Sequence, residues 1–402
     1  MDYQEMVKDL AYVTDTKIVM LIMDGLGGLQ MENGGKTELE TAKTPNMDKL
    51  AASSSCGLLD PIYPGITPGS GPGHLALFGY DPVKWNMGRG VLEALGINFP
   101  LQCGDVAIRI NFSTVDNDGV VTDRRAGRIS TEKCEELAAE LDKIEVSGAE
   151  VMVRPVKEHR AVVVFRADGL GDAINDTDPQ VTGKMPLPME PGDKESEKTV
   201  KITGEWLDQA KNILKDHHPA NMVLLRGFAS YKDYPSFKDM YKLTSAAIAQ
   251  YPMYKGLAGL VGMDVKEDVG DKLEDLVKCL KSNWNDYDFL FVHVKKTDSY
   301  GEDGNFDAKV KIIEEVDTLI PSILDLSPHV LIITGDHSTP AKIGSHSWHP
   351  LPFLLNSEYC RQDRAEEFTE RACARGSMGR LQTTSLMPIA MANALKLKKF
   401  GA

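Results

Sequence analysis

Three uninterrupted apolar runs constrain the fold of this chain more than any other feature of its sequence. They are KIVMLIM at 17–23, FLFVHV at 289–294 and VLII at 330–333. Because the apolar residues are continuous rather than alternating, each run is typical of a strand buried on both faces, as in a parallel sheet covered by helices. The sequence therefore predicts an α/β fold with a mostly parallel central sheet flanked by helices.

Acidic and imidazole side chains follow all three runs. Asp24 comes after the first run; Asp298, Glu302 and Asp303 come after the second; Asp336 and His337 come after the third. Because ligand sites of open α/β sheets lie beyond the carboxyl ends of the strands, we expect these side chains to lie close together there. Each could instead be a turn residue, and Asp24-Gly25 is a common turn pair.

A fourth loop adds an imidazole to this set. The sequence GSHSWHP at 344–350 contains His346, for which His349 is a competing ligand. Carboxylates and imidazoles are suitable ligands for Mn²⁺, Zn²⁺ or Mg²⁺. Two such ions close together would bind the attacking and the leaving oxygen of a phosphoryl transfer. The combined loops therefore predict a two-metal centre.

A serine lies in a glycine-rich loop that leads into an expected helix. In TPGSGPGHLALFGYDP at 67–82, Ser70 stands among three glycines, and an apolar run follows His74. Glycines let the backbone approach a ligand closely, and a helix N-terminus offers free N–H groups to an anion such as phosphate. A metal ion would activate the hydroxyl as a nucleophile. Ser70 is thus the candidate nucleophile, although an ordinary loop has the same composition.

The middle of the chain has a different pattern. Residues 105–114, DVAIRINFST, alternate between apolar and polar, as a half-solvated strand does. Further strands are expected at 151–153 and 161–165, a helix at 131–141, and a long irregular stretch at 169–198. This pattern predicts an α+β domain with an antiparallel sheet. The α/β pattern then returns, with a buried strand at 222–225 and helices around 240–250 and at 257–261.

Composition indicates which binding partners and which cellular location to expect. The net charge of −14 makes nucleic acid an unexpected partner. No apolar run approaches the length needed to cross a bilayer, and the polar, acidic N-terminus does not resemble a signal peptide. The six cysteines form no CxxC pair. We therefore expect a reduced, cytoplasmic protein without a membrane partner; the oligomeric state stays open, a homo-oligomer included.

Nine segments together resemble a known family. They are MDGLGG at 23–28, TPNMDKLA at 44–51, PGSGPGHLALFGYDP at 68–82, RINFSTV at 109–115, DRRAGRIS at 123–130, LLRGFA at 224–229, KKTDSYGEDGN at 295–305, TGDHSTP at 334–340 and HSWHPLPFLL at 346–355. In this order, and over nearly the whole chain, they are similar to the archaeal-type, cofactor-independent phosphoglycerate mutases of the alkaline phosphatase superfamily. The resemblance implies interconversion of 3-phosphoglycerate and 2-phosphoglycerate, without bisphosphoglycerate, through a phosphoserine at a two-metal site.

The resemblance also implies a role for individual residues. One metal would be bound by Asp24, Ser70, Asp336 and His337, and the other by Asp298, Glu302 and His346. The phosphate and carboxylate of the substrate would be bound by His74, Arg109, Arg124, Arg125, Arg128, His159, Arg160, Arg226 and Lys295. Arginine suits both anions because its planar fork can donate two hydrogen bonds at once.

The resemblance further implies an alkaline-phosphatase-like core with a smaller α+β cap domain inserted into it. We expect residues 1–85 and 218–402 to form the discontinuous metal-binding core, and residues 86–217 to form the substrate-binding cap. A mutase must keep water away from its phosphoserine while the glycerate reorients, and closure of a cap would exclude that water.

The chain departs from the family pattern at two places. Glu302 stands where family members usually have histidine, and Gly71-Pro72-Gly73 replaces the commoner Asp-Thr-Ala. Glutamate favours Mn²⁺ or Mg²⁺, with Zn²⁺ or Co²⁺ as alternatives, and Asp303 could replace it as the ligand. Two other functions stay open: a metal-dependent phosphatase or phosphomutase acting on another small phosphorylated acid, and a non-catalytic binding protein that has lost one metal.

Overall fold

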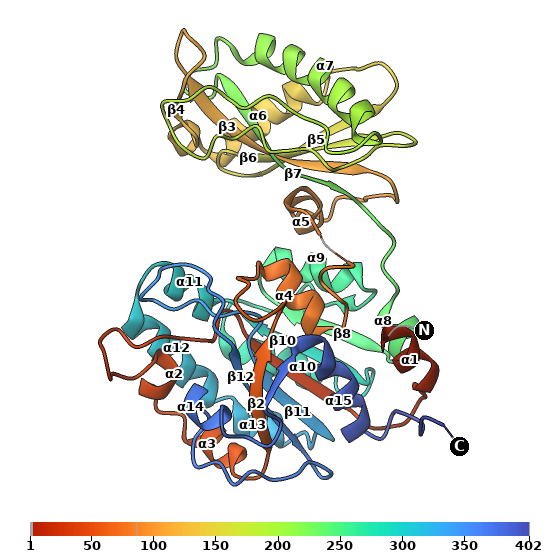
Figure 1. The fold of residues 1–402 in the computed structure, drawn as a ribbon, viewed down its shortest axis with the longest axis vertical. Coiled ribbons are helices and arrows are strands. Elements are labelled where there is room, and N and C mark those ends of the chain that lie inside the picture. The colour runs from red at the N-terminus through yellow and green to blue at the C-terminus, as the bar shows by residue number, and fades with distance from the viewer. Residues whose placement is uncertain (1–2, 86, 402) are drawn as a thin grey trace. The chain divides into compact units, whose positions relative to one another are not determined.

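The computed structural model describes residues 3–85 and 87–401 (Figure 1). The chain forms two compact units, one from Met1–Asn86 with Tyr234–Ala402 and the other from Met87–Asp233. The larger unit is therefore discontinuous in sequence, and the smaller unit is an insertion into it.

An eight-stranded sheet organises the larger unit. Its strands, in spatial order, are β13 (Arg380–Gln382), β2 (Ser55–Asp60), β12 (Leu351–Ser357), β11 (Val330–Thr334), β1 (Ile18–Met23), β10 (Phe289–Val294), β8 (Ser245–Ala249) and β9 (Asp264–Val265). Every strand pairing is parallel except the two made by β12, which is antiparallel to both of its neighbours. The expected mostly parallel sheet is confirmed, and the three apolar runs are its central strands.

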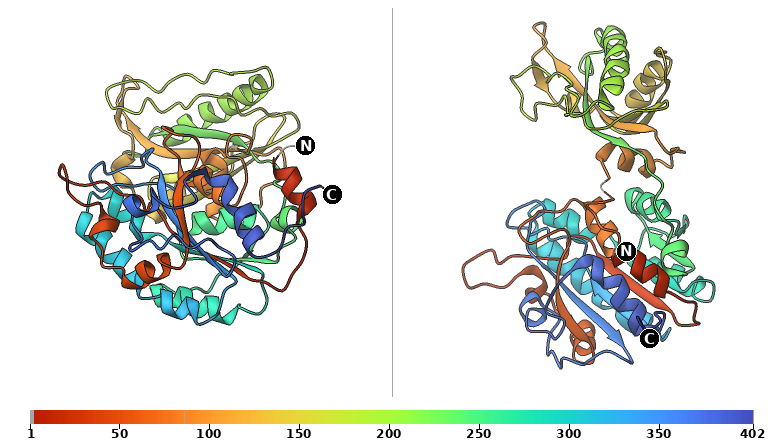
Figure 2. Two further views of the ribbon diagram at one scale, coloured as in Figure 1. Left: turned by 60° about the horizontal axis from the view of Figure 1, so that its bottom comes forward. Right: turned by 45° about the vertical axis from the view of Figure 1, so that its right-hand side comes forward.

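Helices cover both faces of this sheet (Figures 1 and 2). They are α1 (Tyr3–Leu10), α2 (Glu38–Thr41), α3 (Pro45–Ala51), α4 (Ser70–Leu77), α8 (Phe237–Tyr241), α9 (Pro252–Leu260), α10 (Leu273–Ser282), α11 (Lys296–Glu302), α12 (Phe306–Asp317), α13 (Ile320–Leu324), α14 (Glu370–Cys373) and α15 (Leu386–Asn393), with a short 3₁₀ turn η2 (Thr383–Ser385). On one face, apolar residues of β1, β10 and β11 form a buried cluster with α3, α10, α12 and α13. On the other face, Phe291 of β10 meets Phe78 edge-on, with ring centroids 5.0 Å apart.

One expected helix is a strand. Residues around 240–250 were expected to be helical, but the helix α8 ends at Tyr241 and Ser245–Ala249 form β8, which pairs in parallel with β10. The sequence of β8, SAAIA, contains three alanines, the residue with the best helix propensity. All five residues are buried in the sheet, so the tertiary pairing overrides the local preference.

The smaller unit contains a separate antiparallel sheet. Its strands are β4 (Val121–Asp123), β3 (Val106–Val115), β6 (Arg160–Arg166) and β5 (Glu150–Lys157), with β7 (Met222–Ser230) also paired to β3. The helices are α5 (Arg89–Gly96), α6 (Thr131–Leu141) and α7 (Ser196–Leu214), with a 3₁₀ turn η1 (Ala126–Arg128). Trp206 of α7 is fully buried against Phe165 of β6 in a core that α6 and α7 share with the sheet.

The second expected domain boundary is wrong. The strand at 222–225 was expected to belong to the core after a boundary at 218, but it is part of β7, which pairs with β3 from Met222 to Ser230. The boundary therefore lies after Asp233. A buried apolar strand has the same local sequence in either sheet, so the sequence alone does not say which sheet it joins.

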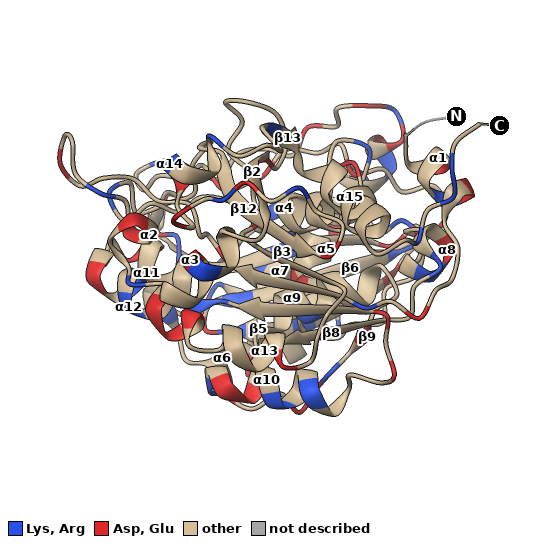
Figure 3. Ribbon diagram, turned by 90° about the horizontal axis from the view of Figure 1, so that it is seen from below, with Lys and Arg blue, Asp and Glu red and all other residues tan. Residues whose placement is uncertain are grey.

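The surface helices carry both signs of charge. Acidic and basic residues are mixed along α10 and α12 (Figure 3). Among the described residues, no helix combines the length and the apolar composition that crossing a membrane requires.

Candidate active site

Four buried acidic or imidazole side chains converge at the carboxyl ends of the central strands. Asp24 directly follows β1, Asp336 and His337 follow β11, and Asp298 lies in the first turn of α11, which begins two residues after β10. All four are at most 1 % exposed. Because β1 pairs in parallel with both β10 and β11, the three strands end side by side and bring these residues together.

The first candidate metal group consists of Asp24, Asp336 and His337, each offering a ligand atom within 4.8 Å of the others. His337 Nε2 lies 3.3 Å from Asp24 Oδ1 and 3.2 Å from Asp336 Oδ2. Asp24 Oδ1 and Asp336 Oδ2 are buried oxygens without a hydrogen-bond partner among the described residues. Buried carboxylate oxygens need a compensating partner, so this group fits a divalent cation.

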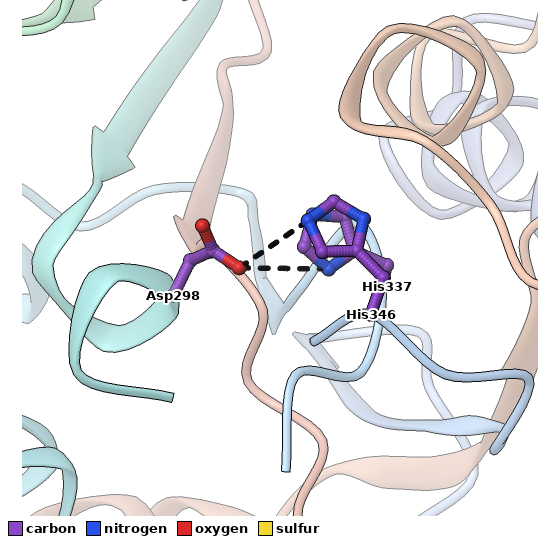
Figure 4. A group of neighbouring side chains, drawn as sticks. All are labelled: Asp298, His337 and His346. Atoms are coloured by element: carbon purple, nitrogen blue, oxygen red, sulfur yellow. Dashed lines mark ion pairs between the residues drawn. The ribbon is translucent and has the colours of Figure 1, made fainter. Parts of the chain in front are cut away.

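The second candidate metal group consists of Asp298, His337 and His346 (Figure 4). Asp298 Oδ1 lies 3.9 Å from His337 Nδ1 and 3.6 Å from His346 Nε2. The two imidazole rings stack with centroids 3.6 Å apart. His337 thus belongs to both groups, whereas the resemblance had assigned it to one metal.

The other expected ligands, Glu302, Asp303 and His349, lie outside the two candidate metal groups. Glu302 is 54 % exposed, and its Oε1 lies 3.8 Å from His346 Nε2. Partial burial and the charge of Asp298 raise the pKa of Glu302. Asp303 is exposed, and the His349 ring contacts Ser347 and Trp348 instead of either group.

Ser70 is the first residue of α4, and its Oγ lies 3.3 Å from His337 Nε2. His74, one turn further along α4, has its Nδ1 2.9 Å from the Ser70 carbonyl oxygen and 3.1 Å from Asp336 Oδ2. A Cβ atom at Gly73 would lie 2.6 Å from the Asp336 carbonyl oxygen. Glycine at this position therefore lets the helix start approach the loop after β11.

Lys295 belongs to this edge of the larger unit. Its Nζ donates to Asp298 Oδ2 at 2.6 Å and lies 3.1 Å from Asp24 Oδ2, so one ammonium group bridges the two candidate metal groups. The hydroxyl of Tyr254, from α9, donates to the same Asp24 oxygen and accepts from Lys295 Nζ at 3.2 Å. Sequence analysis missed Tyr254, because nothing near it in the chain indicates this contact.

Within the first group, electrostatics favours the deprotonated form of Asp24 and the protonated form of His337. Burial alone would raise the pKa of Asp24, but the contact with the His337 imidazole and the charge of Lys295 hold that pKa well below its usual range. Burial alone would lower the pKa of His337, but the carboxylates of Asp336 and Asp24 raise it to about 9. Without a cation, the first group therefore pairs the Asp24 carboxylate with a His337 imidazolium.

The smaller unit gathers several of the expected basic residues. Arg109 on β3 lies opposite Arg226 on β7, and Asn111 two residues further lies opposite Arg160 on β6. Burial lowers the pKa of Arg109, the carboxylate of Glu93, 3.3 Å away, opposes that shift, and the nearby charges of Arg160, Arg89 and Arg226 add to it. Arg89, at the start of α5, was missed by sequence analysis; it adds a further positive charge to this cluster.

Two buried side-chain nitrogens in this cluster lack hydrogen-bond partners among the described residues. Burial and the charges of Arg160 and Arg109 lower the pKa of His159 to about 4, so this imidazole is neutral. Arg160 Nε and His159 Nδ1 are buried without a hydrogen-bond partner among the described residues. The unpaired Arg160 Nε–H donor beside several arginines suits an anion.

The three arginines of the DRRAGR segment have different surroundings. Arg124 donates to both carboxylate oxygens of Asp178, at 2.8 and 2.7 Å, so its guanidinium is already paired. Arg125 and Arg128 are exposed. Arg125 lies close enough to His159 to influence its pKa, whereas no contact with the cluster is found for the side chain of Arg128 among the described residues.

These features define a class: an α/β protein with a candidate divalent-metal centre beside a serine that starts a helix. A family model described as 2,3-bisphosphoglycerate-independent phosphoglycerate mutase matches residues 51–221. A probable enzyme of that name from Thermus thermophilus is 52% identical over 406 aligned positions that span all of both chains. Its counterpart from Aquifex aeolicus is 47% identical and covers 99% of this chain and 100% of its own.

Two solved structures are also similar to this chain. A protein from Pyrococcus horikoshii is 31% identical, covers 97% of this chain and 100% of its own, and has a TM-score of 0.83. A cofactor-independent phosphoglycerate mutase from Thermoplasma acidophilum is 30% identical, covers 94% of this chain and 100% of its own, and has a TM-score of 0.73. The chain belongs to the family of 2,3-bisphosphoglycerate-independent phosphoglycerate mutases.

Proposed function

We propose that this enzyme interconverts 3-phosphoglycerate and 2-phosphoglycerate, without bisphosphoglycerate, through a phosphoserine at Ser70. One observation carries the proposal: the Ser70 hydroxyl starts a helix and lies 3.3 Å from His337, the residue that belongs to both candidate metal groups. A nucleophile in that position can attack a phosphoryl group held between the two groups.

The residues divide the chemistry between them. Asp24, Asp336 and His337 would hold one divalent cation, with Ser70 as a further ligand, and Asp298 and His346 would hold the other, with His337 within reach of both. When bound, the two cations would lower the pKa of the serine hydroxyl and neutralise charge on the phosphoryl oxygens.

Ser70 and the glycerate exchange the phosphoryl group in two displacements. In the first, a bond forms between Ser70 Oγ and phosphorus while the bond from phosphorus to the glycerate oxygen breaks. In the second, the other glycerate hydroxyl attacks phosphorus and releases Ser70. The free N–H groups at the start of α4 would stabilise the negative phosphoryl oxygens in both displacements.

We assign the anionic groups of the substrate to the basic residues. Lys295 would bind beside the metal groups, whereas Arg109, Arg160, Arg226 and His159 in the smaller unit would bind phosphate or carboxylate. Arg124 is paired with Asp178, so it would act mainly by ordering the loop that carries Asp178. Arg125 and Arg128 are exposed and would contribute charge.

Metal identity and cellular location are finer proposals. We propose Mn²⁺ or Mg²⁺ as the working ions, with Zn²⁺ or Co²⁺ as weaker alternatives, because the carboxylate of Glu302 lies beside the second group where it could complete the ligand set. The acidic composition and the unpaired cysteines support a cytoplasmic location. A homo-oligomer stays a prediction.

The test is an assay on 3-phosphoglycerate without added bisphosphoglycerate. Chelator-stripped protein is assayed alone and after addition of Mn²⁺, Mg²⁺, Zn²⁺ or Co²⁺, and both 2-phosphoglycerate and free phosphate are followed. We expect metal-dependent 2-phosphoglycerate with little free phosphate. Phosphate as the main product would identify a phosphatase, and the absence of both products would contradict the proposed substrate.

A further inference from the structure

A buried lysine outside the candidate metal groups contacts the loops that carry their residues. Lys309 of α12 is 0 % exposed, although lysine is almost never fully buried unless it is paired. Burial lowers its pKa, and the charges of Glu38 and Glu370 oppose that shift. Removing an ammonium group from water is costly, so a buried lysine needs partners that compensate this cost.

The ammonium group contacts backbone carbonyls of two site loops. Lys309 Nζ donates to the carbonyl oxygens of Gly25 at 2.9 Å, Gly27 at 3.1 Å and Thr339 at 2.8 Å. An ammonium group has three N–H donors, and here three carbonyls accept them. The first two carbonyls belong to the loop after Asp24, and the third belongs to the loop after His337.

The Thr339 contact leads directly to both metal groups. Thr339 Oγ1 donates to Asp298 Oδ1 at 2.6 Å, and it lies 2.9 Å from His337 Nδ1. One hydroxyl therefore sets the orientation of a carboxylate of the second group and of the imidazole shared by both groups. The backbone of the same residue is held by Lys309.

The loops after β1 and β11 are in close contact at Gly25 and Thr339. Gly25 has a positive φ of 62°, and a Cβ there would lie 2.5 Å from Thr339 Oγ1 and 2.8 Å from Asp298 Oδ1. The Thr339 backbone N–H also donates to the Gly25 and Gly27 carbonyls at 3.2 and 3.1 Å. A shift of Thr339 would therefore be transmitted to Asp298 and His337.

Glu38 contacts the same two loops as Lys309. Its carboxylate is fully buried, lies 3.9 Å from Lys309 Nζ, and accepts from the backbone N–H groups of Leu29 at 3.0 Å and Ala341 at 2.8 Å. Lys309 and Glu38 thus hold the same two loops, one through carbonyls and the other through N–H groups.

We infer that Lys309 is a positioning residue for the metal centre, which acts by fixing the loops after β1 and β11 so that Thr339 orients Asp298 and His337. The inference rests on the proposed function, because it takes these two residues as metal ligands. Residues that orient ligands in this way usually change metal affinity by about 10- to 100-fold when they are replaced.

The experiment compares Lys309→Met with Lys311→Met as the matched control. Lys311 lies on the same helix, and its side chain is 76 % exposed. Mn²⁺ affinity is measured by electron paramagnetic resonance, ligand geometry by the visible spectrum of the Co²⁺ form, and stability by thermal denaturation of the metal-free protein. We expect Lys309→Met to weaken Mn²⁺ binding by about 10- to 100-fold and to alter the Co²⁺ spectrum. Lys311→Met should do neither.

A lower melting temperature with unchanged Mn²⁺ affinity and an unchanged Co²⁺ spectrum would overturn the inference, because a purely structural lysine would give that result. Should Lys309→Met not fold, Lys309→Arg serves instead: its planar fork keeps the charge but cannot reproduce three diverging hydrogen bonds. We expect an intermediate Mn²⁺ affinity from that variant, and wild-type affinity would overturn the inference. Failure of the wild-type protein to bind Mn²⁺ would instead contradict the proposed function.

Discussion

Ser70 is the first residue of α4, and its hydroxyl oxygen lies 3.3 Å from His337 Nε2. We predict that Ser70→Ala lowers mutase activity by at least about 10³-fold, because removal of a catalytic nucleophile leaves only binding and electrostatic contributions. The melting temperature should stay close to that of the wild type, since Ser70 is not part of an apolar core cluster. Retained activity would remove Ser70 as the nucleophile.

Glu302 gives the second prediction at the residue scale. Replacing it with histidine should shift the relative affinity from Mn²⁺ towards Zn²⁺ or Co²⁺ by about 10-fold, because an imidazole suits these ions better than a carboxylate does. Competition titrations of the metal-free protein measure the ratio. Asp303→Asn tests the alternative ligand, and we expect it to leave the ratio unchanged. An unchanged ratio in Glu302→His would favour Asp303 as the ligand, or a site with fewer ligands.

The raised pKa of His337, about 9, predicts proton release on metal binding. A metal ligand must be a neutral imidazole, whereas His337 is protonated in the metal-free protein at neutral pH. We expect about one proton released per chain when Mg²⁺ binds, at about pH 6.5 and at about pH 8 alike. Calorimetry in buffers of different ionisation enthalpy gives this number. A histidine of ordinary pKa would release about half a proton at the lower pH and almost none at the higher.

At the scale of single elements, α14 anchors itself to the loop after β1 through Glu370. Glu370 is partly buried, and its two carboxylate oxygens accept from the Gly28 N–H at 3.0 Å and from the Thr37 hydroxyl at 2.8 Å. Burial raises the pKa of Glu370 from 4.5 to about 7. Because the folded-state pKa is the higher one, the group favours folding most below pH 4.5, and that contribution is lost as the pH rises to about 7.

The prediction is a pH-dependent effect of Glu370→Gln. The variant resembles the protonated wild type, so the two should be similarly stable at about pH 4.5, and at about pH 8 the variant should gain up to about 3 kcal/mol relative to the wild type. Urea denaturation at several pH values measures the difference. Glu358→Gln is the control, because Glu358 is exposed. A difference that does not change with pH would contradict the raised pKa.

At the scale of the whole molecule, each unit has its own sheet and its own buried cluster. Trp206 is the largest fully buried side chain among the described residues, and it belongs to the smaller unit. Trp206→Ala should therefore destabilise that unit by about 3–5 kcal/mol, through lost burial and a cavity.

Hydrogen exchange measures this prediction unit by unit. In Trp206→Ala, we expect faster exchange in β3, β6 and β7, while the amides of β1, β10 and β11 keep wild-type protection. The larger unit of the same variant is the internal control, and its Mn²⁺ affinity should stay unchanged. An equal loss of protection in both units would show that they unfold together.

Much of the larger unit could be predicted from sequence, since the pattern is local. The continuous apolar runs at 17–23, 289–294 and 330–333 identify strands buried on both faces, and the acids that follow them must then lie at one edge. In the smaller unit, the helix expected at 131–141 is confirmed with the same bounds, because it has a serine cap and an amphipathic pattern. These features depend on residues close together in the chain.

Other features depend on residues far apart in the chain, and only the tertiary structure determines them. Alanine-rich β8 is a strand because β10 lies beside it, and β7 joins the smaller sheet because β3 offers it an edge. His337 belongs to both metal groups through distances that no spacing encodes. Tyr254 and Lys309 look like ordinary helix residues until the fold places their polar atoms against Asp24 and the Gly25 carbonyl. Sequence alone thus determined which residues could do chemistry, and folding determined which of them meet.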